Sequence, residues 1–327
     1  MIARQTLTVL LISIITGTAS AADPSALDLL TSMQTAGEKL NYHGTLIYIQ
    51  DGQAQSMRIV HKIDDDGEFE RVVSLNGSLR EVIRSNDVVS CFLPDANAVT
   101  ISRGQFAGDV LSKVAANDFG VLQNYYEFQR ESTGRVAGLE AKIIRIKPKD
   151  EFRYGYRLWL EKQTDLLLKS DLLNRDDNVL EQAMFADVSI VNYIPQEMLK
   201  PSIAGEGLEH FEHDNSMVDA AEFKTDWRLG DIPAGFEVKK LGRRSFEGDD
   251  QSVEHWVVSD GLASVSIYIE KLVDDSEKFD GASQLGAMNI YGRSLDGYQI
   301  TVIGDVPTVT AKNIAQSMSA SPMNGND

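Results

Sequence analysis

Short runs of β-branched and aromatic residues alternate with turn-forming residues along the first two thirds of the chain. Asp51-Gly52, Asp66-Gly67 and Asn76-Gly77 separate the early runs, and Asn76-Gly77 is typical of a two-residue hairpin turn. This spacing predicts an antiparallel meander. The predicted strands occupy residues 43–49, 56–63, 69–75, 79–84, 88–93, 98–101, 125–131, 139–147, 154–161, 166–173 and 180–191.

Two segments in this region have a different pattern. Asp23-Pro24 combines a capping side chain with a proline suited to a first helical turn, and helical spacing of apolar residues continues to about Gly37. Residues 104–117 are predicted to be helical or irregular. About eleven strands with so little helix predict a large curved sheet or half-open barrel, whose concave face must be covered by these helices or by a ligand.

The strand pattern lapses between residues 195 and 225, where prolines, glycines and acidic residues predict an interdomain linker. Strands are predicted again at 236–241, 253–259, 263–272, 288–293 and 298–303, followed by a helix from Pro307. The fold class is therefore α+β, mostly antiparallel β. The predicted organisation is a first domain at 22–194, a linker at 195–225, a smaller α+β domain at 226–318 and a disordered tail at 319–327.

The N-terminus has the pattern of a cleaved secretory signal at residues 1–21. Arg4 precedes an apolar run at 7–15, and Ala19-Ser20-Ala21 provides the small residues of a cleavage site. The apolar run is shorter than the roughly 18 residues that span a bilayer, which argues against a membrane anchor. Because no cysteine follows the cleavage site to carry a lipid, we expect a soluble protein in the periplasm.

Charge and motifs favour a binding protein over an enzyme. The formal net charge of −18 disfavours nucleic acid as a partner and favours partners with basic segments. The sequence contains no Gly-x-Ser-x-Gly motif and no phosphate-binding loop. Cys91 lies in an apolar run and is predicted to be a buried small hydrophobe, and His210 and His213 are predicted to be solvated linker residues. We therefore predict no catalytic residue, no metal site and no cofactor.

Aromatic residues suggest two candidate binding surfaces, although core packing explains each pattern as well. In the strand at 154–161 the aromatic and aliphatic side chains cover both faces, as in the wall of a cavity for an acyl chain or apolar peptide. The candidate lipid-binding residues are Leu46, Tyr48, Tyr154, Tyr156 and Trp159. The candidate partner-binding residues are Trp227, Phe236 and Trp256 of the second domain.

Ten stretches, in this order along both domains, carry a resemblance to a known family. They include Leu-Asn-Gly-Ser-Leu-Arg-Glu-Val at 75–82 and Leu-Gly-Asp-Ile-Pro-Ala-Gly-Phe at 229–236. The others lie at 40–42, 125–128, 154–160, 169–173, 179–182, 259–262, 301–307 and 310–315. On these stretches the chain resembles the RseB/MucB family of periplasmic regulators of the envelope-stress sigma-E factor.

This resemblance implies a first domain similar to lipoprotein carriers of the LolA/LolB type, and a role in signalling. The family binds the periplasmic segment of a membrane-spanning anti-sigma factor and shields it from regulatory proteolysis, and a lipid or lipopolysaccharide signal releases it. Homo-oligomers are left open. The main alternative is a soluble lipid or lipoprotein carrier that uses the apolar face of the first domain. An enzyme is the third hypothesis, with little support from the motifs.

Overall fold

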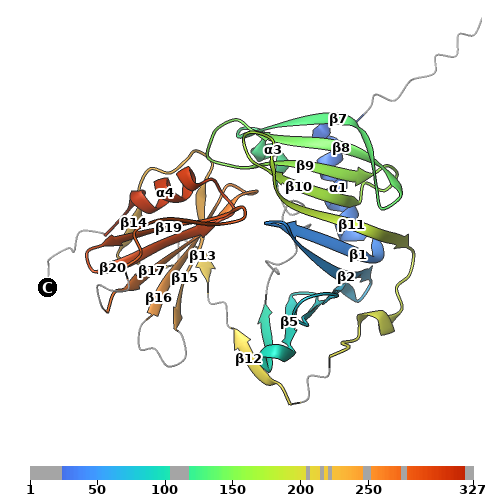
Figure 1. The fold of residues 1–327 in the computed structure, drawn as a ribbon, viewed down its shortest axis with the longest axis horizontal. Helices are drawn as coiled ribbons and strands as arrows, with labels where there is room; N and C mark the ends of the chain where they lie inside the picture. Colours follow the sequence, from blue (N-terminus) through green and yellow to red (C-terminus); the bar gives the residue numbers. More distant parts are fainter. Residues whose placement is uncertain are drawn as a thin grey trace, which may run out of the picture.

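The computed structural model describes residues 24–103, 118–203, 207–213, 217–219, 223–245, 252–273 and 278–320. The predicted signal segment and the segment at 104–117 lie outside the described residues. Two β-sheet domains lie side by side, the first drawn in blue to green and the second in orange to red (Figure 1).

The first helix, α1 (Ala26–Lys39), begins with a capping box at Ser25. The Ser25 hydroxyl accepts the N–H of Asp28 at 3.2 Å, and the Asp28 carboxylate accepts the N–H of Ser25 at 2.9 Å. The cap is therefore Ser25 and not the predicted Asp23, because Ser25 is the residue that has an acidic partner at the third helical position.

The first sheet has twelve strands in the order β12-β6-β5-β4-β3-β2-β1-β11-β10-β9-β8-β7 (Figure 1). Its neighbouring strands are antiparallel except β12 and β6, which run parallel. The sheet ends in two edge strands and is therefore open, as the sequence predicts. Strand bounds are β1 (Asn41–Gln50), β2 (Gln53–Asp64), β3 (Gly67–Ser74), β4 (Glu81–Ser85), β5 (Val88–Leu93), β6 (Ala98–Arg103), β7 (Tyr126–Val136), β8 (Leu139–Pro148), β9 (Gly155–Glu161), β10 (Leu167–Leu173), β11 (Val179–Val191) and β12 (Glu209–His213).

Of two predicted tight turns, the first forms and the second is replaced by a longer loop. Asp51 and Gly52 have φ of 49° and 71°, the left-handed values of a tight two-residue hairpin turn between β1 and β2. Asn76-Gly77 does not form the predicted two-residue turn, because β3 ends at Ser74 and β4 begins only at Glu81. Instead the Asn76 side chain accepts the N–H of Ser56 at 2.6 Å, which fixes a longer loop against β2.

Helix α1 packs on the apolar face of this sheet. Leu30 and Met33 are buried among sheet residues such as Ile144 and Phe185. The short helix α3 (Phe119–Leu122) joins the same core. Burial of apolar surface of this extent is the main source of stability for the domain.

The predicted linker is more ordered than its composition suggests. A 3-10 helix, η2 (Gln196–Leu199), packs on the sheet, with Leu199 against Val60. The fully buried Glu81 carboxylate accepts the N–H groups of Ser202 and Ile203, each at 2.9 Å. The linker then contributes β12 to the first sheet and β13 (Val218–Asp219) to the second. An acidic segment can form edge strands, because an edge needs backbone pairing and no buried side-chain face.

The second domain is a seven-stranded antiparallel sheet in the order β13-β15-β16-β17-β20-β19-β18, covered by helix α4 (Thr308–Ser317) (Figure 1). Its core includes Val258, Ile267, Val302 and Ile314. The sheet strands are β15 (Glu237–Ser245), β16 (Ser252–Ser259), β17 (Ser264–Lys271), β18 (Gly281–Leu285), β19 (Met288–Leu295) and β20 (Tyr298–Gly304).

Two features of this domain differ from the sequence prediction. The edge strand β18 was not predicted, because its Gly-Ala-Ser-Gln-Leu sequence lacks apolar alternation. The predicted disordered tail begins too early, because Ser319 and Ala320 pair with Arg228 and Trp227 in a two-stranded sheet of β14 (Trp227–Leu229) and β21 (Met318–Ala320).

Candidate binding site at the domain junction

A buried arginine joins the two domains. Arg153 lies between β8 and β9, and its side chain has no solvent exposure. Its Nη1 lies 3.1 Å from Oδ2 of Asp260, a fully buried carboxylate in the turn between β16 and β17. Its Nη2 donates to the carbonyl oxygen of Ala234 at 2.5 Å, and Nε lies 3.2 Å from the Asp150 carboxylate. A charge of the first domain is thus neutralised mainly by groups of the second.

Asp260 accepts hydrogen bonds from both domains. The Tyr126 hydroxyl donates to Oδ2 at 2.8 Å, while the N–H groups of Leu262 and Ala263 donate to Oδ1 at 2.9 and 2.7 Å. Burial, followed by the negative charge of Asp260, raises the pKa of Tyr126 well above its usual value. The phenol therefore stays protonated and remains a donor. The Leu262 side chain joins the core of the first domain.

Aromatic rings enclose the guanidinium group of Arg153. Its Cζ lies 5.0 Å from the ring centres of Tyr125 and Phe236 and 5.5 Å from that of Tyr126. Gly235 has φ of +90°, and a Cβ added there would lie 2.6 Å from the Tyr125 ring. The close approach of the two domains at this point therefore requires glycine.

A second set of contacts continues the junction along the chain. The Asn289 amide donates to the Tyr154 hydroxyl at 3.0 Å, and the Thr310 hydroxyl donates to the Phe152 carbonyl oxygen at 2.6 Å. Tyr154 also packs against Ala287 in a small apolar cluster. The loop at 149–154 therefore contacts the second domain through side chain and backbone alike.

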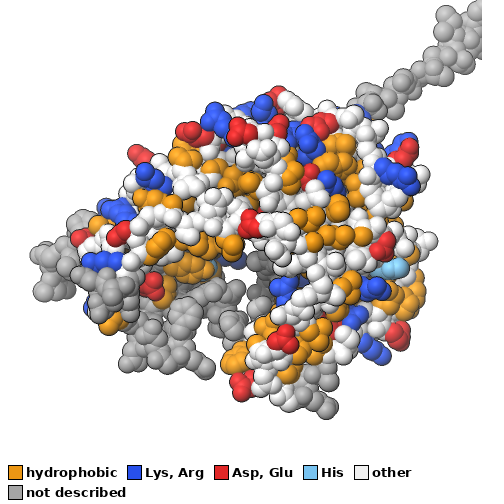
Figure 2. Space-filling model, in the orientation of Figure 1, with side chains coloured by type: hydrophobic (Ala, Val, Ile, Leu, Met, Phe, Trp, Pro, Cys, Tyr) orange, Lys and Arg blue, Asp and Glu red, His pale blue; other side chains and the backbone are white. Residues whose placement is uncertain are grey.

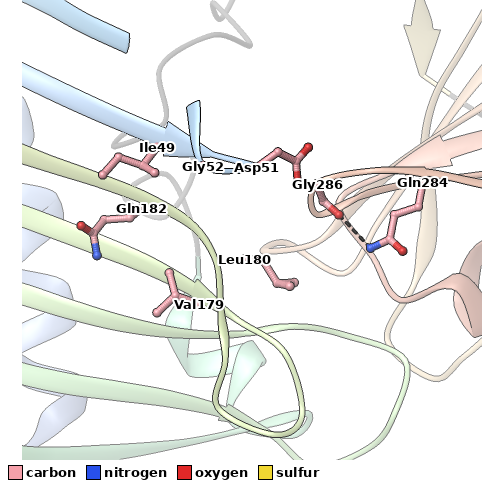
Figure 3. Close-up of a pocket in the computed structure, with 8 residues that line it drawn as sticks. All are labelled: Ile49, Asp51, Gly52, Val179, Leu180, Gln182, Gln284 and Gly286. Atoms are coloured by element: carbon pink, nitrogen blue, oxygen red, sulfur yellow. Dashed lines mark hydrogen bonds between the residues drawn. The ribbon is translucent and has the colours of Figure 1, made fainter. Parts of the chain in front are cut away.

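A pocket of about 350 Å³ opens beside this junction. Its lining comes from both domains (Figure 3): the β1–β2 hairpin, the start of β11 and the β18–β19 hairpin. Gly286 has φ of +61°, and a Cβ there would lie 2.7 Å from the Gln50 amide, so the two hairpins are in close contact. The lining residues are Ile49, Asp51, Gly52, Val179, Leu180, Gln182, Gln284 and Gly286.

Carboxylates act on two tyrosines near the junction. Burial, and then the charge of Glu181 and a hydrogen bond with it, raise the pKa of Tyr48, with smaller contributions from Asp305 and Asp51. Burial and then the charges of Asp305, Asp260 and Glu181 raise the pKa of Tyr156 in the same direction. Both phenols are therefore protonated, and they lie in a region of negative potential.

The predicted lipid-binding residues fall in three places. Leu46 is buried in the core beneath α1. Tyr48, Tyr154 and Tyr156 lie at the junction, where they share the carboxylates described above. Trp159 points to the opposite face of β9 from Leu158 and Leu160, and the Lys169 ammonium lies 4.2 Å from its ring centre. Their role in lipid binding stays a prediction.

The predicted partner-binding aromatics are buried. Trp227 and Trp256 belong to the core of the second domain, with 7% and 4% of their surface exposed. Phe236 belongs to the same core and also contacts Arg153 at the junction. Their burial accounts for them as core residues, and a role in contacting a partner stays a prediction.

Other candidate groups fit structural roles. His61 is buried between the Leu40 carbonyl oxygen and the Glu68 carboxylate, and His255 is buried beside Ser266. His210 lies on edge strand β12. Burial raises the pKa of the half-buried Cys91 thiol. Over the part of the chain that the structure describes, no three His, Cys, Asp or Glu side chains form a group that could hold a metal ion.

Sequence patterns do not identify Arg153 and Asp260 as functional residues. Asp260 lies inside the stretch at 259–262 that carries the family resemblance, and Arg153 directly precedes the stretch at 154–160. Neither stretch signals an ion pair, because the pairing joins distant parts of the chain.

On the face drawn in Figure 2, apolar side chains gather over the strands of the first domain, with acidic and basic side chains scattered around them.

Fold and junction together define a two-domain, mostly antiparallel β protein whose domains share a buried ion pair and an adjoining pocket. The chain belongs to the MucB/RseB family: residues 25–203 match the MucB/RseB N-terminal domain and residues 221–319 match the MucB/RseB C-terminal domain. Among the described helices, none has the length and apolar character needed to cross a membrane.

Relatives of known role align over nearly the whole chain. The sigma-E factor regulatory protein RseB of Haemophilus influenzae is 30% identical over 307 residues, covering 92% of this chain and 93% of that protein. The sigma factor AlgU regulatory protein MucB of Pseudomonas aeruginosa is 29% identical and covers 91% of each. The crystal structure of MucB in complex with MucA(peri) is 27% identical, covers 90% of this chain and 99% of that chain, and has a TM-score of 0.71.

Proposed function

We propose that this chain is a periplasmic regulator that binds the periplasmic segment of a membrane-spanning anti-sigma factor. Binding would shield that segment from regulatory proteolysis and so keep a sigma-E-type stress response off. The observation that carries this proposal is the likeness, over both domains, to MucB as crystallised with MucA(peri). The protein acts by binding, and no chemical step is required of it.

The buried junction suggests how two domains serve one binding event. Arg153 and Asp260 hold the domains in one arrangement, so a segment that contacts both meets a surface that is already assembled. A preassembled surface lowers the ordering cost of binding. An extended segment held against both domains would be out of reach of a protease that needs to bind it in the open.

The location follows from the N-terminal sequence. Residues 1–21 have the charge, apolar run and small residues of a secretory signal. Cleavage before Ala22 would release the mature protein into the periplasm, where the partner segment lies. Mass spectrometry of the protein isolated from the periplasm tests this, and a retained Met1 would contradict it.

The release signal in this proposal is a lipid or lipopolysaccharide. Tyr48, Tyr154 and Tyr156 provide apolar rings at the junction, next to the contacts that hold the domains together. A lipid that binds a different domain arrangement from the one that binds the segment lowers the affinity for the segment. Linkage requires that the segment lower the affinity for the lipid by the same factor.

A binding titration tests the proposal. The purified periplasmic segment of the anti-sigma factor from the same organism is titrated into the mature protein in a calorimeter, first alone and then with lipopolysaccharide present. We expect saturable binding that lipopolysaccharide weakens. An absence of binding overturns the proposed partner, while binding that lipopolysaccharide leaves unchanged overturns only the release signal.

A further inference from the structure

The pocket beside the junction offers hydrogen-bond acceptors to a ligand. The Gln182 amide donates an N–H to Asp171 at 2.7 Å, and the Gln284 amide donates to the Gly286 carbonyl oxygen at 2.8 Å (Figure 3). Each amide thus has one of its two hydrogens engaged within the protein and retains one N–H donor and its carbonyl oxygen. The Asp51 carboxylate is an acceptor only, so this end of the lining suits a group that donates hydrogen bonds.

The charge of the pocket points in the same direction. Asp51 is the one charged residue among the described lining residues, and it is exposed at the hairpin tip. Glu181 lies on the neighbouring position of β11, and its charge, with those of Asp305 and Asp51, acts on Tyr48. The Asp51 carboxylate in the lining favours a cation over an anion or a neutral polar group.

The apolar lining and the volume of the pocket favour a cation that carries an aliphatic chain. Ile49, Val179 and Leu180 provide its apolar lining, and Val179 is 50% exposed. Lysine and arginine side chains combine an apolar stem with a charged, donor-only end group. A volume of about 350 Å³ accommodates such a side chain.

We propose that this pocket receives a lysine or arginine side chain of the bound anti-sigma segment, with the stem against Ile49, Val179 and Leu180 and the charged group on Asp51. Because the lining comes from both domains, the side chain contacts both at once. The pocket therefore exists only in this arrangement of the domains, and a change that separates the β1–β2 and β18–β19 hairpins abolishes it. This inference rests on the proposed function.

The hairpin tip allows a matched pair of variants. Asp51→Asn removes the charge, and asparagine tolerates the left-handed φ of 49° at this position. Asp296→Asn makes the same change in the Asp296-Gly297 turn, where φ is 50° and 81°, away from the pocket lining. A charged hydrogen-bonded contact of this kind predicts a loss of about fivefold in affinity for Asp51→Asn, strongest at low salt, and wild-type affinity for Asp296→Asn.

A third variant fills the pocket from within the chain. Gln284→Lys adds an ammonium group to the lining and is expected to compete with the incoming side chain, so it also weakens binding. On the segment, each lysine and arginine is replaced by methionine in turn. One replacement should weaken binding to the wild type and leave binding to Asp51→Asn unaltered.

The outcomes separate the two proposals. If the segment binds wild type and Asp51→Asn with equal affinity, the pocket proposal is overturned and the proposed function stands. If the segment binds neither protein, the proposed partner is overturned, and the pocket is then tested with N-acetyl-arginine amide by NMR. Shifts at residues 49–52 and 284–286 that Asp51→Asn abolishes would support a cation pocket, and the absence of such shifts would overturn it.

Discussion

The substitution Asp260→Asn tests whether the buried ion pair holds the two domains together. Asparagine has nearly the same shape as aspartate and retains an oxygen that accepts the N–H groups of Leu262 and Ala263. It removes the negative charge 3.1 Å from the guanidinium of Arg153, and it puts an N–H donor in place of the oxygen that accepts the Tyr126 hydroxyl. The variant therefore changes the charge and the polar contacts at the junction and leaves the packing around them in place.

The expected loss of stability follows from burial. Both side chains of the pair are fully buried, and removing one partner of such a pair typically costs about 3–5 kcal/mol. Asp150, which lies 3.2 Å from Nε of Arg153 and is 30% exposed, retains part of the compensation. We therefore expect a loss near the lower end, about 3 kcal/mol.

Tryptophan fluorescence during denaturant unfolding provides the assay. Trp159 belongs to the first domain, while Trp227 and Trp256 belong to the second. We expect the wild type to unfold in one transition and Asp260→Asn to unfold in two, with the second domain separating first. Small-angle scattering below the first transition should show a more extended protein, because the domains then move apart.

A double variant shows whether the effect is the uncompensated charge. In Arg153→Met/Asp260→Asn no lone charge is left buried, so the total loss should be smaller than the sum of the two single losses. Glu140→Gln, which breaks the exposed pair with Lys162, is the control and should leave unfolding unchanged. An Asp260→Asn protein that unfolds in one transition within about 0.5 kcal/mol of the wild type would refute a stabilising role for the pair.

Three further predictions concern the linker, the junction and the cysteine. Burial alone would raise the pKa of Glu81, but hydrogen bonds from Ser202, Arg71 and Ile203 bring it below its ordinary value of 4.5. The stability that the Glu81 carboxylate contributes is therefore complete above about pH 4.5 and is lost as the pH falls through the lower pKa of the folded protein. Glu81→Gln should destabilise the protein at neutral pH, and its difference from wild type in urea unfolding should shrink in acid. Gly235→Ala should destabilise more than Gly297→Ala in thermal unfolding, because both positions have positive φ and only the first would bring a Cβ against Tyr125; equal losses would contradict this. Cys91 should react with iodoacetamide more slowly in the native protein than in urea, since burial raises the pKa of its thiol; equal rates, followed by mass spectrometry, would exclude that protection.

Local signals in the sequence predicted most of the first sheet. Strand-forming runs and paired turn residues act over a few positions, and Asp51-Gly52 forms the tight turn that such a pair favours. The prediction failed where the local signal was weak or ambiguous. β18 has small and polar residues because one of its edges is unpaired, and β12 is acidic because it too lies at an edge. Asn76-Gly77 had the strongest hairpin signal, yet its side chain bonds to β2 and lengthens the loop.

The junction could not be predicted from local patterns. Tyr126 and Asp260 are separated by 134 residues in the chain, and no periodicity links them. A buried arginine has the same sequence appearance as an exposed one, so Arg153 gave no signal. The aromatic stretch at 154–160 is dense in rings, and part of it lies at the junction. Its neighbour Arg153 makes the polar contacts there, and the structure was needed to identify them.

The most direct test of the proposed regulator is a cleavage assay. The periplasmic segment of the anti-sigma factor is incubated with the protease that makes the first regulatory cut, with and without a saturating amount of the mature protein. We expect the protein to slow cleavage, and we expect Asp260→Asn, whose domains should separate more easily, to protect less at the same concentration. A cleavage rate that the wild-type protein leaves unchanged would overturn the proposed shielding of the segment.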